Sequence, residues 1–403
     1  MALLPVREAL ERVLAGVTPL GAEDVALAEA LGRTLARDLA ARRTQPPAAV
    51  SAMDGYAVRA ADAATAPVTL TVIGQAAAGH PFEGSVAAGQ AVRIFTGGVL
   101  PNGADAIVIQ ENAARDRDRV TLASAAVAGR HIRREGIDFR AGDVLLSKGA
   151  RLTDRDLMLA AAMNHPTLPV HRRPRVAIFG TGDELVPPGA EPSPGEIVYS
   201  NGFALAALTS TAGAVADHVG VVRDNPAEIR DAIRRARDTR ADILVTSGGA
   251  SVGDHDLVQQ ALKDEGLELA FWRIAMRPGR PMLSGRLGPM HVLGLPGNPV
   301  SSYVCATLFL VPLIRRLCGD ARASPPRASA VLGRDLPMND EREDYLRAVL
   351  STDAGGALTA TPVDNQDSSL VAPLARADCL VIREPYAQAA RAGSRCVILK
   401  LGL

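Results

Sequence analysis

The sequence is poor in aromatic residues: Phe, Trp and Tyr together make up 3% of its 403 residues, with a single Trp. Surfaces that stack single-stranded nucleic-acid bases rely on aromatic side chains, so this composition argues against such a surface. The charge balance points the same way, because 44 Lys and Arg residues offset 44 Asp and Glu residues. We therefore expect no nucleic-acid partner, and any anion-binding site must be a local feature.

Metal-type cysteine spacing and long apolar runs are also lacking. The four cysteines show neither CxxC nor zinc-type spacing and stand in apolar surroundings, which is typical of reduced packing residues: Cys305, Cys318, Cys379 and Cys396. The first eight residues already include an acid and a base, and no signal-peptide core follows. The longest apolar run, Val300–Ile314, has 15 residues, fewer than a membrane span needs. These features predict a cytoplasmic protein without a membrane contact.

The chain is too long for one hydrophobic core, so several domains are expected. Apolar spacing predicts helices over 6–15 and 22–39. Short strand-like runs separated by glycine follow a Pro-Pro break and predict an inserted β-rich module. The predicted domains are an elongated N-terminal domain of mixed helices and strands (1–45 and 138–172), a β-rich insert (46–137), an α/β domain (173–322) and a small C-terminal β domain (323–403).

Strands and helices alternate regularly in the α/β part. The expected strands cover 176–179, 216–222, 242–245 and 290–293, and the expected helices cover 203–210, 226–237, 257–262 and 301–316. This alternation predicts a doubly wound, mostly parallel sheet. Ligands bind such sheets beyond the carboxyl ends of the strands, so the turns that follow the strands are candidate sites.

A glycine-rich loop follows the expected strand 242–245. Gly248 and Gly249 allow a close backbone approach to an anion, with N–H groups pointing outward. Ser251 adds a hydroxyl, while Asp254 and Asp256 add carboxylates that suit a divalent cation. A plain strand–turn–helix connection with an Asp N-cap is the simpler alternative for this loop.

Two further turns carry acids. Asp183 and Glu184 follow the first strand of the α/β domain, and Asp224 precedes an expected helix. Taken singly, the first turn could be a solvated loop and Asp224 an N-cap. If the turns face one crevice, their carboxylates would suit a hard cation.

A basic turn lies later in the α/β domain. Arg273, Arg277 and Arg280 stand around a Pro-Gly turn, and arginine forks bind tetrahedral oxyanions bidentately. The alternative is a charged β-bend. The segment Leu295–Ser302 opens a helix, either as an anion site or as a simple capped start.

These strings together resemble the MoeA family, the molybdopterin molybdotransferases, along essentially the whole chain; a similar module forms the C-terminal part of gephyrin. The matching strings are Ser51–Ala57, Phe95–Gly98, Gly180–Leu185, Tyr199–Asn201, Ser247–Asp256, Arg277–Pro281 and Leu295–Pro299. The resemblance implies that molybdate is inserted into molybdopterin adenylate with release of AMP and with Mg²⁺. It also implies a homodimer with shared sites, and a molybdopterin adenylyltransferase as an upstream partner.

Residue roles come from the same resemblance. The implied catalytic residues are Asp54, Thr96, Glu184, Asp224 and Asp256, with Asp54 and Thr96 contributed by the partner subunit. The implied metal ligands are Asp183, Glu184, Asp224 and Asp256. The implied molybdopterin-binding residues are Gly248, Gly249, Ser251, Asp254, Arg273, Pro296, Pro299, Arg133 and Asp138. The implied molybdate ligands are Arg277, Arg280, Ser301, Arg347 and either Ser368 or Ser369.

The chain departs from the family pattern in three places. Arginine replaces the common lysine in the basic turn, Asp367 replaces a glycine before the tail serines, and the segment that ends at Asp138 lacks a second acid. Two other functions remain open: a molybdopterin-nucleotide binding or scaffolding protein without turnover, and a molybdopterin adenylyltransferase. The hydrolytic acids together with the basic turn favour the transferase.

Overall fold

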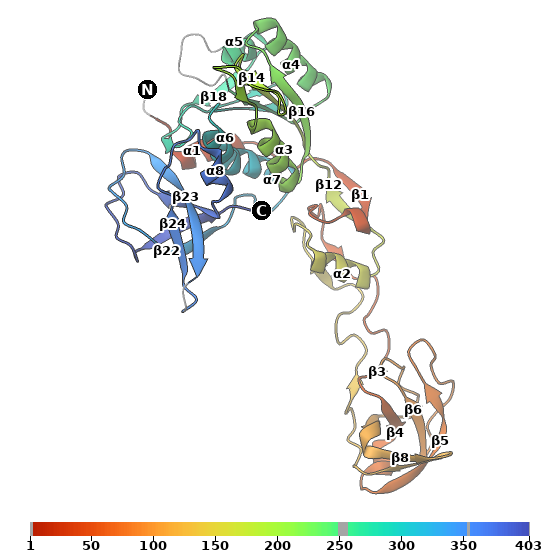
Figure 1. Cartoon of the computed structure of the whole chain (residues 1–403). Helices are drawn as coiled ribbons and strands as arrows, with labels where there is room; N and C mark the ends of the chain where they lie inside the picture. Colours follow the sequence, from red (N-terminus) through yellow and green to blue (C-terminus); the bar gives the residue numbers. More distant parts are fainter. Residues whose placement is uncertain (1–2, 249–256, 353–354, 403) are drawn as a thin grey trace.

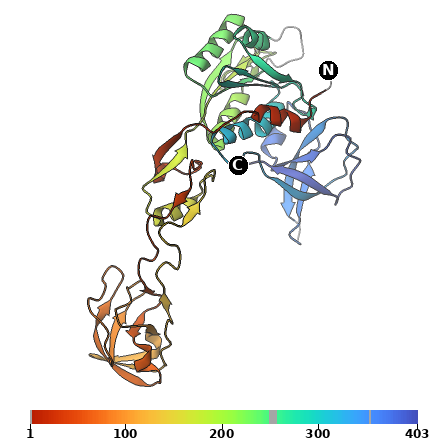
Figure 2. The same cartoon turned by 180° about the vertical axis from the view of Figure 1, so that it is seen from behind.

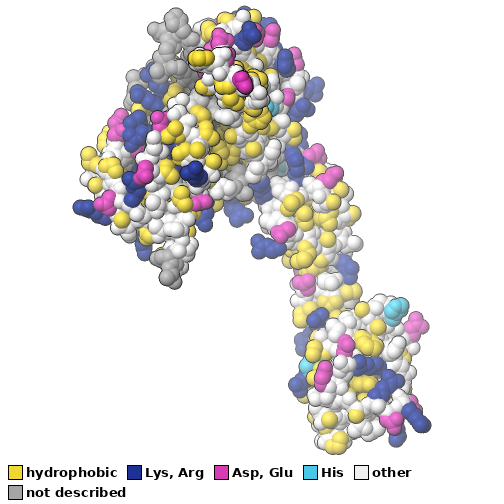
Figure 3. Space-filling model, in the orientation of Figure 1, with side chains coloured by type: hydrophobic (Ala, Val, Ile, Leu, Met, Phe, Trp, Pro, Cys, Tyr) yellow, Lys and Arg dark blue, Asp and Glu magenta, His cyan; other side chains and the backbone are white. Residues whose placement is uncertain are grey.

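A computed structural model describes residues 3–248, 257–352 and 355–402. The chain is elongated: an α/β domain and a C-terminal β domain lie together at one end, and a β-rich lobe lies at the other (Figure 1). A narrow middle domain connects them. Side chains of both signs are interspersed over the face in Figure 3, as expected for a chain without net charge.

The sheet of the α/β domain has the strand order β16-β13-β17-β21-β20-β18. Neighbours from β16 to β21 run parallel, whereas β20 and β18 pair antiparallel at one edge. The strands are β13 (Arg175–Thr181), β16 (Val215–Val222), β17 (Ile243–Ser247), β18 (Glu268–Trp272), β20 (Leu283–Leu287) and β21 (Met290–Leu295). The predicted doubly wound, mostly parallel sheet is confirmed.

Helices cover both faces of this sheet. Val176 and Ile178 pack toward one layer, and the intervening Ala177 and Phe179 pack toward the other, as alternation along a strand requires. The first layer contains α1 (Val6–Leu14), α3 (Asn201–Ala212), α6 (Pro299–Cys305) and α7 (Val311–Leu317), and the second contains α4 (Pro226–Asp238) and α5 (Leu257–Asp264). Thus α1 packs in the α/β core (red in Figure 2), although sequence order groups it with the N-terminal domain.

The helix after β21 is longer than the sequence indicates. A π-helical segment, Ala306–Leu310, joins α6 to α7, so the whole helix spans Pro299–Leu317. By length and composition this helix could cross a membrane, which corrects the argument from the 15-residue apolar run. Within the protein, however, 89% of it is buried, as expected for a core helix.

The middle domain is built from small pairs of strands. β1 (Ala22–Ala26) pairs with β12 (Thr167–His171), β2 (Leu39–Ala40) pairs with β11 (Val144–Leu146), and α2 (Asp154–Ala162) packs beside them. The helix predicted over 22–39 is wrong: β1 and a 3₁₀ turn (Leu27–Glu29) occupy this segment. Its apolar spacing fits a helix, but pairing with the distant β12 overrides that local preference.

The β-rich lobe confirms the strands expected there. Its sheet has the order β7-β4-β6-β5-β9-β8, and a separate pair, β3 with β10, faces the middle domain (Figure 1). The elements are β3 (Val50–Ser51), β4 (Gly55–Val58), β5 (Val68–Ala76), β6 (Gln90–Ile94), β7 (Ala106–Ile109), β8 (Ala113–Asp116), β9 (Arg119–Leu122), β10 (Ile132–Arg133), and the 3₁₀ turns Ala60–Ala63 and Gln110–Asn112.

The C-terminal domain is a barrel-like sheet in which β23 also pairs with β25. Its elements are β22 (Arg327–Leu332), β23 (Glu343–Thr352), β24 (Leu358–Pro362), α8 (Val371–Ala375), β25 (Cys379–Arg383) and β26 (Arg395–Lys400). A short strand of the α/β domain, β19 (Met276–Arg277), joins this sheet beside β23. The basic turn is therefore attached to both domains.

Candidate functional site

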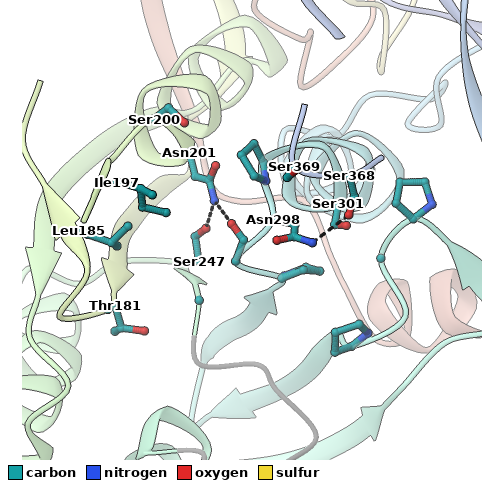
Figure 4. Close-up of a pocket in the computed structure, with 18 of the residues that line it drawn as sticks. Thr181, Leu185, Ile197, Ser200, Asn201, Ser247, Asn298, Ser301, Ser368 and Ser369 are labelled. Atoms are coloured by element: carbon teal, nitrogen blue, oxygen red, sulfur yellow. Dashed lines mark hydrogen bonds between the residues drawn. The ribbon is translucent and has the colours of Figure 1, made fainter. Parts of the chain in front are cut away.

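A pocket of about 1220 Å³ opens at the carboxyl ends of β13, β17 and β21. Loops from both the α/β and the C-terminal domains line it, and so does the small strand pair β14 (Leu185–Val186) and β15 (Ile197–Val198). Figure 4 shows Asn201 directed toward Ser247, and Asn298 directed toward Ser368, among the residues that line this pocket. Its volume exceeds the range usual for a drug-sized ligand, so a ligand of several parts fits it.

The two acidic turns meet at the pocket, as the sequence predicts. Glu184 and Asp224 line it, and the backbone N–H of Asp224 donates to Oδ1 of Asp183 at 3.2 Å. Burial, followed by the negative charges of Asp183 and Glu184, raises the pKa of Asp224. A cation bound beside these carboxylates would offset the repulsion between their negative charges.

A metal would need further oxygen ligands here. Within the described ranges, no three Asp, Glu, His or Cys side chains lie close enough together to hold a metal on their own. Asp256, the fourth predicted metal ligand, lies outside the described residues. Mg²⁺ commonly binds through one or two carboxylates, waters and substrate phosphates, so the acidic turn fits a site that the substrate completes.

The start of the glycine loop is held beneath the pocket. Gly248 has φ +96°, and a Cβ there would lie 2.5 Å from the carbonyl oxygen of Thr181. A side chain would therefore clash with the end of β13, which explains the glycine. The predicted binding and catalytic residues Gly249, Ser251, Asp254 and Asp256 fall outside the described part of the chain.

The basic turn lines the same pocket as the acidic turns. Arg277 lines the pocket while its guanidinium contacts the carboxylate of Asp344 and lies 3.6 Å from that of Asp340. Arg280 also lines the pocket, is exposed, and makes no hydrogen bond or ion pair through its guanidinium to any residue in the described ranges. The two predicted molybdate arginines thus differ: one is charge-paired, and the other faces solvent.

Gly279 presses this turn against α6. It has φ +110°, and a Cβ would lie 2.5 Å from Sγ of Cys305. Ser301, in the first turn of the same helix, is buried and lines the pocket, as do Pro296 and Pro299 just before it. The predicted oxyanion and pterin-binding residues of this segment therefore share one wall.

The predicted ligand Arg347 lies behind the C-terminal loop and does not line the pocket. Its side chain is 1% exposed, and its guanidinium donates to the carbonyl oxygens of Asn365, Asp367 and Leu370 at 2.9 to 3.1 Å. These contacts hold the loop that presents Ser368 to the pocket. We therefore interpret Arg347 as a residue that positions this loop.

Arg273 also lies away from the pocket lining. Its guanidinium stacks over the Trp272 ring with 5.0 Å to the centroid, and its backbone has φ +91°. Its backbone carbonyl accepts from the N–H of Leu4. In this single chain it contributes to the junction of β18 with the N-terminal segment.

The predicted residues of the lobe do not meet the pocket within one chain. Asp54 accepts from both the backbone N–H and the hydroxyl of Thr96, at 2.7 and 2.8 Å, and these bonds lower its pKa. Arg133 lies on β10, and Asp138 lies on the return to the middle domain. The lobe lies at the far end of the molecule from the α/β domain in Figure 1, and none of the four residues lines the pocket.

Sequence reasoning assigned no role to several residues of the pocket. Asn201 donates to Oγ of Ser247 at 2.8 Å and to the carbonyl of Gly297 at 2.7 Å, which joins three loops (Figure 4). Burial raises the pKa of Tyr199 to about 12. Arg342 also lines the pocket, from the C-terminal domain. The motif containing Tyr199 and Asn201 was visible in the sequence, but its hydrogen-bond partners lie on distant loops.

Family models cover nearly the whole chain. The MoeA N-terminal region (domain I and II) matches residues 4–164, and the probable molybdopterin binding domain matches 177–316. The MoeA C-terminal region (domain IV) matches 329–401. The order of these matches agrees with the middle and β-rich domains, the α/β domain and the C-terminal sheet.

Curated relatives and solved structures agree. The chain is 39% identical over 333 residues to the molybdopterin molybdenumtransferase of Nostoc sp., covering 80% of this chain and 76% of that protein. It is 35% identical to the Haemophilus influenzae protein of the same name, covering 91% and 90%. A solved molybdopterin biosynthesis MoeA protein from Pyrococcus horikosii superimposes with a TM-score of 0.84 and 31% identity, covering 100% of both chains. The chain therefore belongs to the MoeA family.

Proposed function

We propose that this chain inserts molybdate into molybdopterin adenylate and releases AMP, which yields the molybdenum cofactor. The observation that carries this proposal is that acidic side chains and a set of basic and hydroxyl-bearing side chains line one and the same pocket. The curated relatives, named molybdopterin molybdenumtransferases, support molybdenum insertion as the reaction.

The acidic residues at the pocket suit the phosphoanhydride of the adenylate. Asp224 and Glu184 line it, and Asp183 supports it through the backbone of Asp224. Bound there, Mg²⁺ would offset the charge that develops as the anhydride is cleaved. The carboxylates would hold the ion, and Asp256 in the neighbouring loop is proposed as a further ligand.

The basic and hydroxyl-bearing residues of the pocket suit a tetrahedral dianion. Arg280 offers a guanidinium that has no partner among the described residues, while Ser301 and Ser368 offer hydroxyl groups at the same pocket. Arg277 adds a planar fork whose charge is partly balanced by Asp344. Arginine forks and hydroxyl donors are the groups that recognise oxyanions. Ser247, Gly248 and the loop beyond them are proposed to bind the pterin phosphate.

We also propose a cytoplasmic homodimer. The separation of Asp54 and Thr96 from the pocket within one chain supports a shared site, in which the lobe of one subunit completes the pocket of the other. Arg133 and Asp138 would approach from the same direction. The four free cysteines are compatible with a reducing compartment. A molybdopterin adenylyltransferase is the proposed upstream supplier of substrate.

Purified molybdopterin adenylate tests the proposal directly. We expect AMP release and molybdenum incorporation that depend on molybdate and on Mg²⁺. Binding without AMP release would instead support a scaffolding protein. Formation of the adenylate from molybdopterin and ATP would support an adenylyltransferase.

A further inference from the structure

Asn298 connects the α/β domain with the C-terminal domain at the edge of the pocket. Its side-chain amide donates to Oγ of Ser368 at 2.8 Å, which Figure 4 shows as a dashed line. Two residues on, the backbone N–H of Val300 donates to the carbonyl oxygen of Ser368 at 3.0 Å. The position of Ser368 is therefore fixed by a segment of the other domain, through both its backbone and its side chain.

The Asn298 amide also restricts the hydrogen bonds that the Ser368 hydroxyl can make. A serine hydroxyl has one proton to donate and two lone pairs to accept with. The Asn298 amide uses one lone pair and cannot accept through its nitrogen. Since Ser368 donates to no acceptor in the described part of the chain, its hydroxyl can donate to a ligand. Both residues line the pocket, so an oxyanion bound there can accept a hydrogen bond from the Ser368 hydroxyl.

The neighbouring Ser369 differs, because its hydroxyl already donates a hydrogen bond within the protein. The hydroxyl and the backbone N–H of Ser369 both donate to Oδ1 of Asp367, each at 2.8 Å. These bonds lower the pKa of Asp367, so its carboxylate stays charged and continues to accept the hydrogen bond from the Ser369 hydroxyl. Of the two serines, Ser368 is therefore the one whose hydroxyl proton has no acceptor among the described residues.

We propose that Asn298 is a positioning residue for the oxyanion, because it holds the Ser368 hydroxyl as a donor toward the pocket. The inference rests on the proposed function, since it takes molybdate as the oxyanion. It adds a specific requirement: the residue at position 298 must donate to Ser368 and must not accept from it.

Oxyanion binding to the full-length chain tests this requirement without turnover. We would titrate sodium molybdate and sodium tungstate calorimetrically into the unsubstituted protein and into Asn298→Asp. Aspartate keeps the size and is equally favourable before a helix, so the fold is expected to persist. Its carboxylate would accept a hydrogen bond from the Ser368 hydroxyl and repel the oxyanion. We therefore expect the affinity for the oxyanion to fall at least about tenfold. Asn102→Asp, the same change at an exposed position in the lobe, should leave the affinity unchanged.

A double-mutant cycle separates positioning from charge. Asn298→Ala should weaken oxyanion binding in the unsubstituted protein, but should have no further effect in Ser368→Ala. Ser369→Ala should leave the affinity within twofold. Independent effects of Asn298→Ala and Ser368→Ala, or unchanged binding by Asn298→Asp, would overturn the inference while the molybdate site stands. If the unsubstituted protein binds neither oxyanion, the proposed molybdate site fails, and this inference fails with it.

Discussion

At the scale of one residue, the charge of Asp224 destabilises the folded protein because two other carboxylates lie nearby. Partial desolvation of this exposed residue and the charges of two other acids raise its pKa in the folded protein. A group whose pKa is raised on folding binds its proton more tightly in the folded state. As pH rises through the unfolded and then the folded pKa of this group, its contribution therefore lowers stability.

Asp224→Asn should thus abolish AMP release and yet raise the thermal stability of the chain. The amide removes the charge that the neighbouring acids oppose, so the gain in melting temperature should be largest near pH 7. It should shrink as pH falls through the raised pKa and be absent below the usual Asp pKa. Thermal unfolding between pH 3 and 8 would measure it, with the exposed Asp118→Asn as control. An unchanged or lower melting temperature at pH 7, or wild-type AMP release, would contradict this view of the acidic turn.

The two arginines of the basic turn predict unequal effects. Arg280 has no charged partner in the described part of the chain, whereas Arg277 is held by Asp344 and Asp340. We expect Arg280→Ala to raise the molybdate concentration needed for insertion about tenfold or more. Arg277→Ala should act less strongly, and Arg280→Lys should be milder than Arg280→Ala because it keeps the charge. Molybdate titrations of the insertion reaction would rank the variants, and a reversed order would show that Arg277 is the main ligand.

Residue types in a pattern predicted where this site lies but not how each side chain is used. The glycine and acid-rich turns follow buried strands, so their convergence on one edge of the sheet was predictable. The burial of Arg347 was not, because it depends on a loop of the C-terminal domain folding over the guanidinium. The pairing of Arg277 with Asp344 likewise depends on how two domains meet.

At the scale of elements, local patterns sufficed where strands and helices alternate. The helix predicted over 22–39 failed because the partner of β1 lies far along the chain, and no local pattern reports it. The addition of β19 to the sheet of the C-terminal domain was also invisible, since it is a two-residue strand. Yet that pairing sets Arg277 beside Asp344 in register and fixes the basic turn between the domains.

Gly279 is the element-scale test of that turn. In Gly279→Ala the new methyl group would meet Cys305 at a positive φ, which should cost about 1–3 kcal/mol of stability and shift the basic turn away from α6. We expect a lower denaturation midpoint and a higher molybdate requirement, with partial recovery in Gly279→Ala/Cys305→Ala. Gly266→Ala is the matched control, because Gly266 has φ +92° but an open surrounding. Equal losses in both single variants would indicate backbone strain without a packing role for the turn.

At the scale of the whole molecule, the elongated shape separates residues that the proposed reaction needs together. The lobe carries the Asp54–Thr96 pair at one end, and the pocket lies at the other. Within one chain the lobe cannot serve that pocket, so we infer that a second copy supplies it. A C₂ dimer contains each contact twice, so it would contain two equivalent composite sites.

Mixing two inactive variants tests this arrangement. A heterodimer of Asp54→Asn with Asp224→Asn should carry one composite site with both substitutions and one with neither. Random exchange of subunits makes about half of the dimers mixed, so about a quarter of wild-type activity should return. Each variant incubated with itself is the control, and differently tagged subunits would verify that mixed dimers form. If mixed dimers form without recovered AMP release, Asp54 and Asp224 act in the same subunit or Asp54 has no part in the site. Recovery near a quarter would mean that each pocket is built from the α/β domain of one subunit and the lobe of the other.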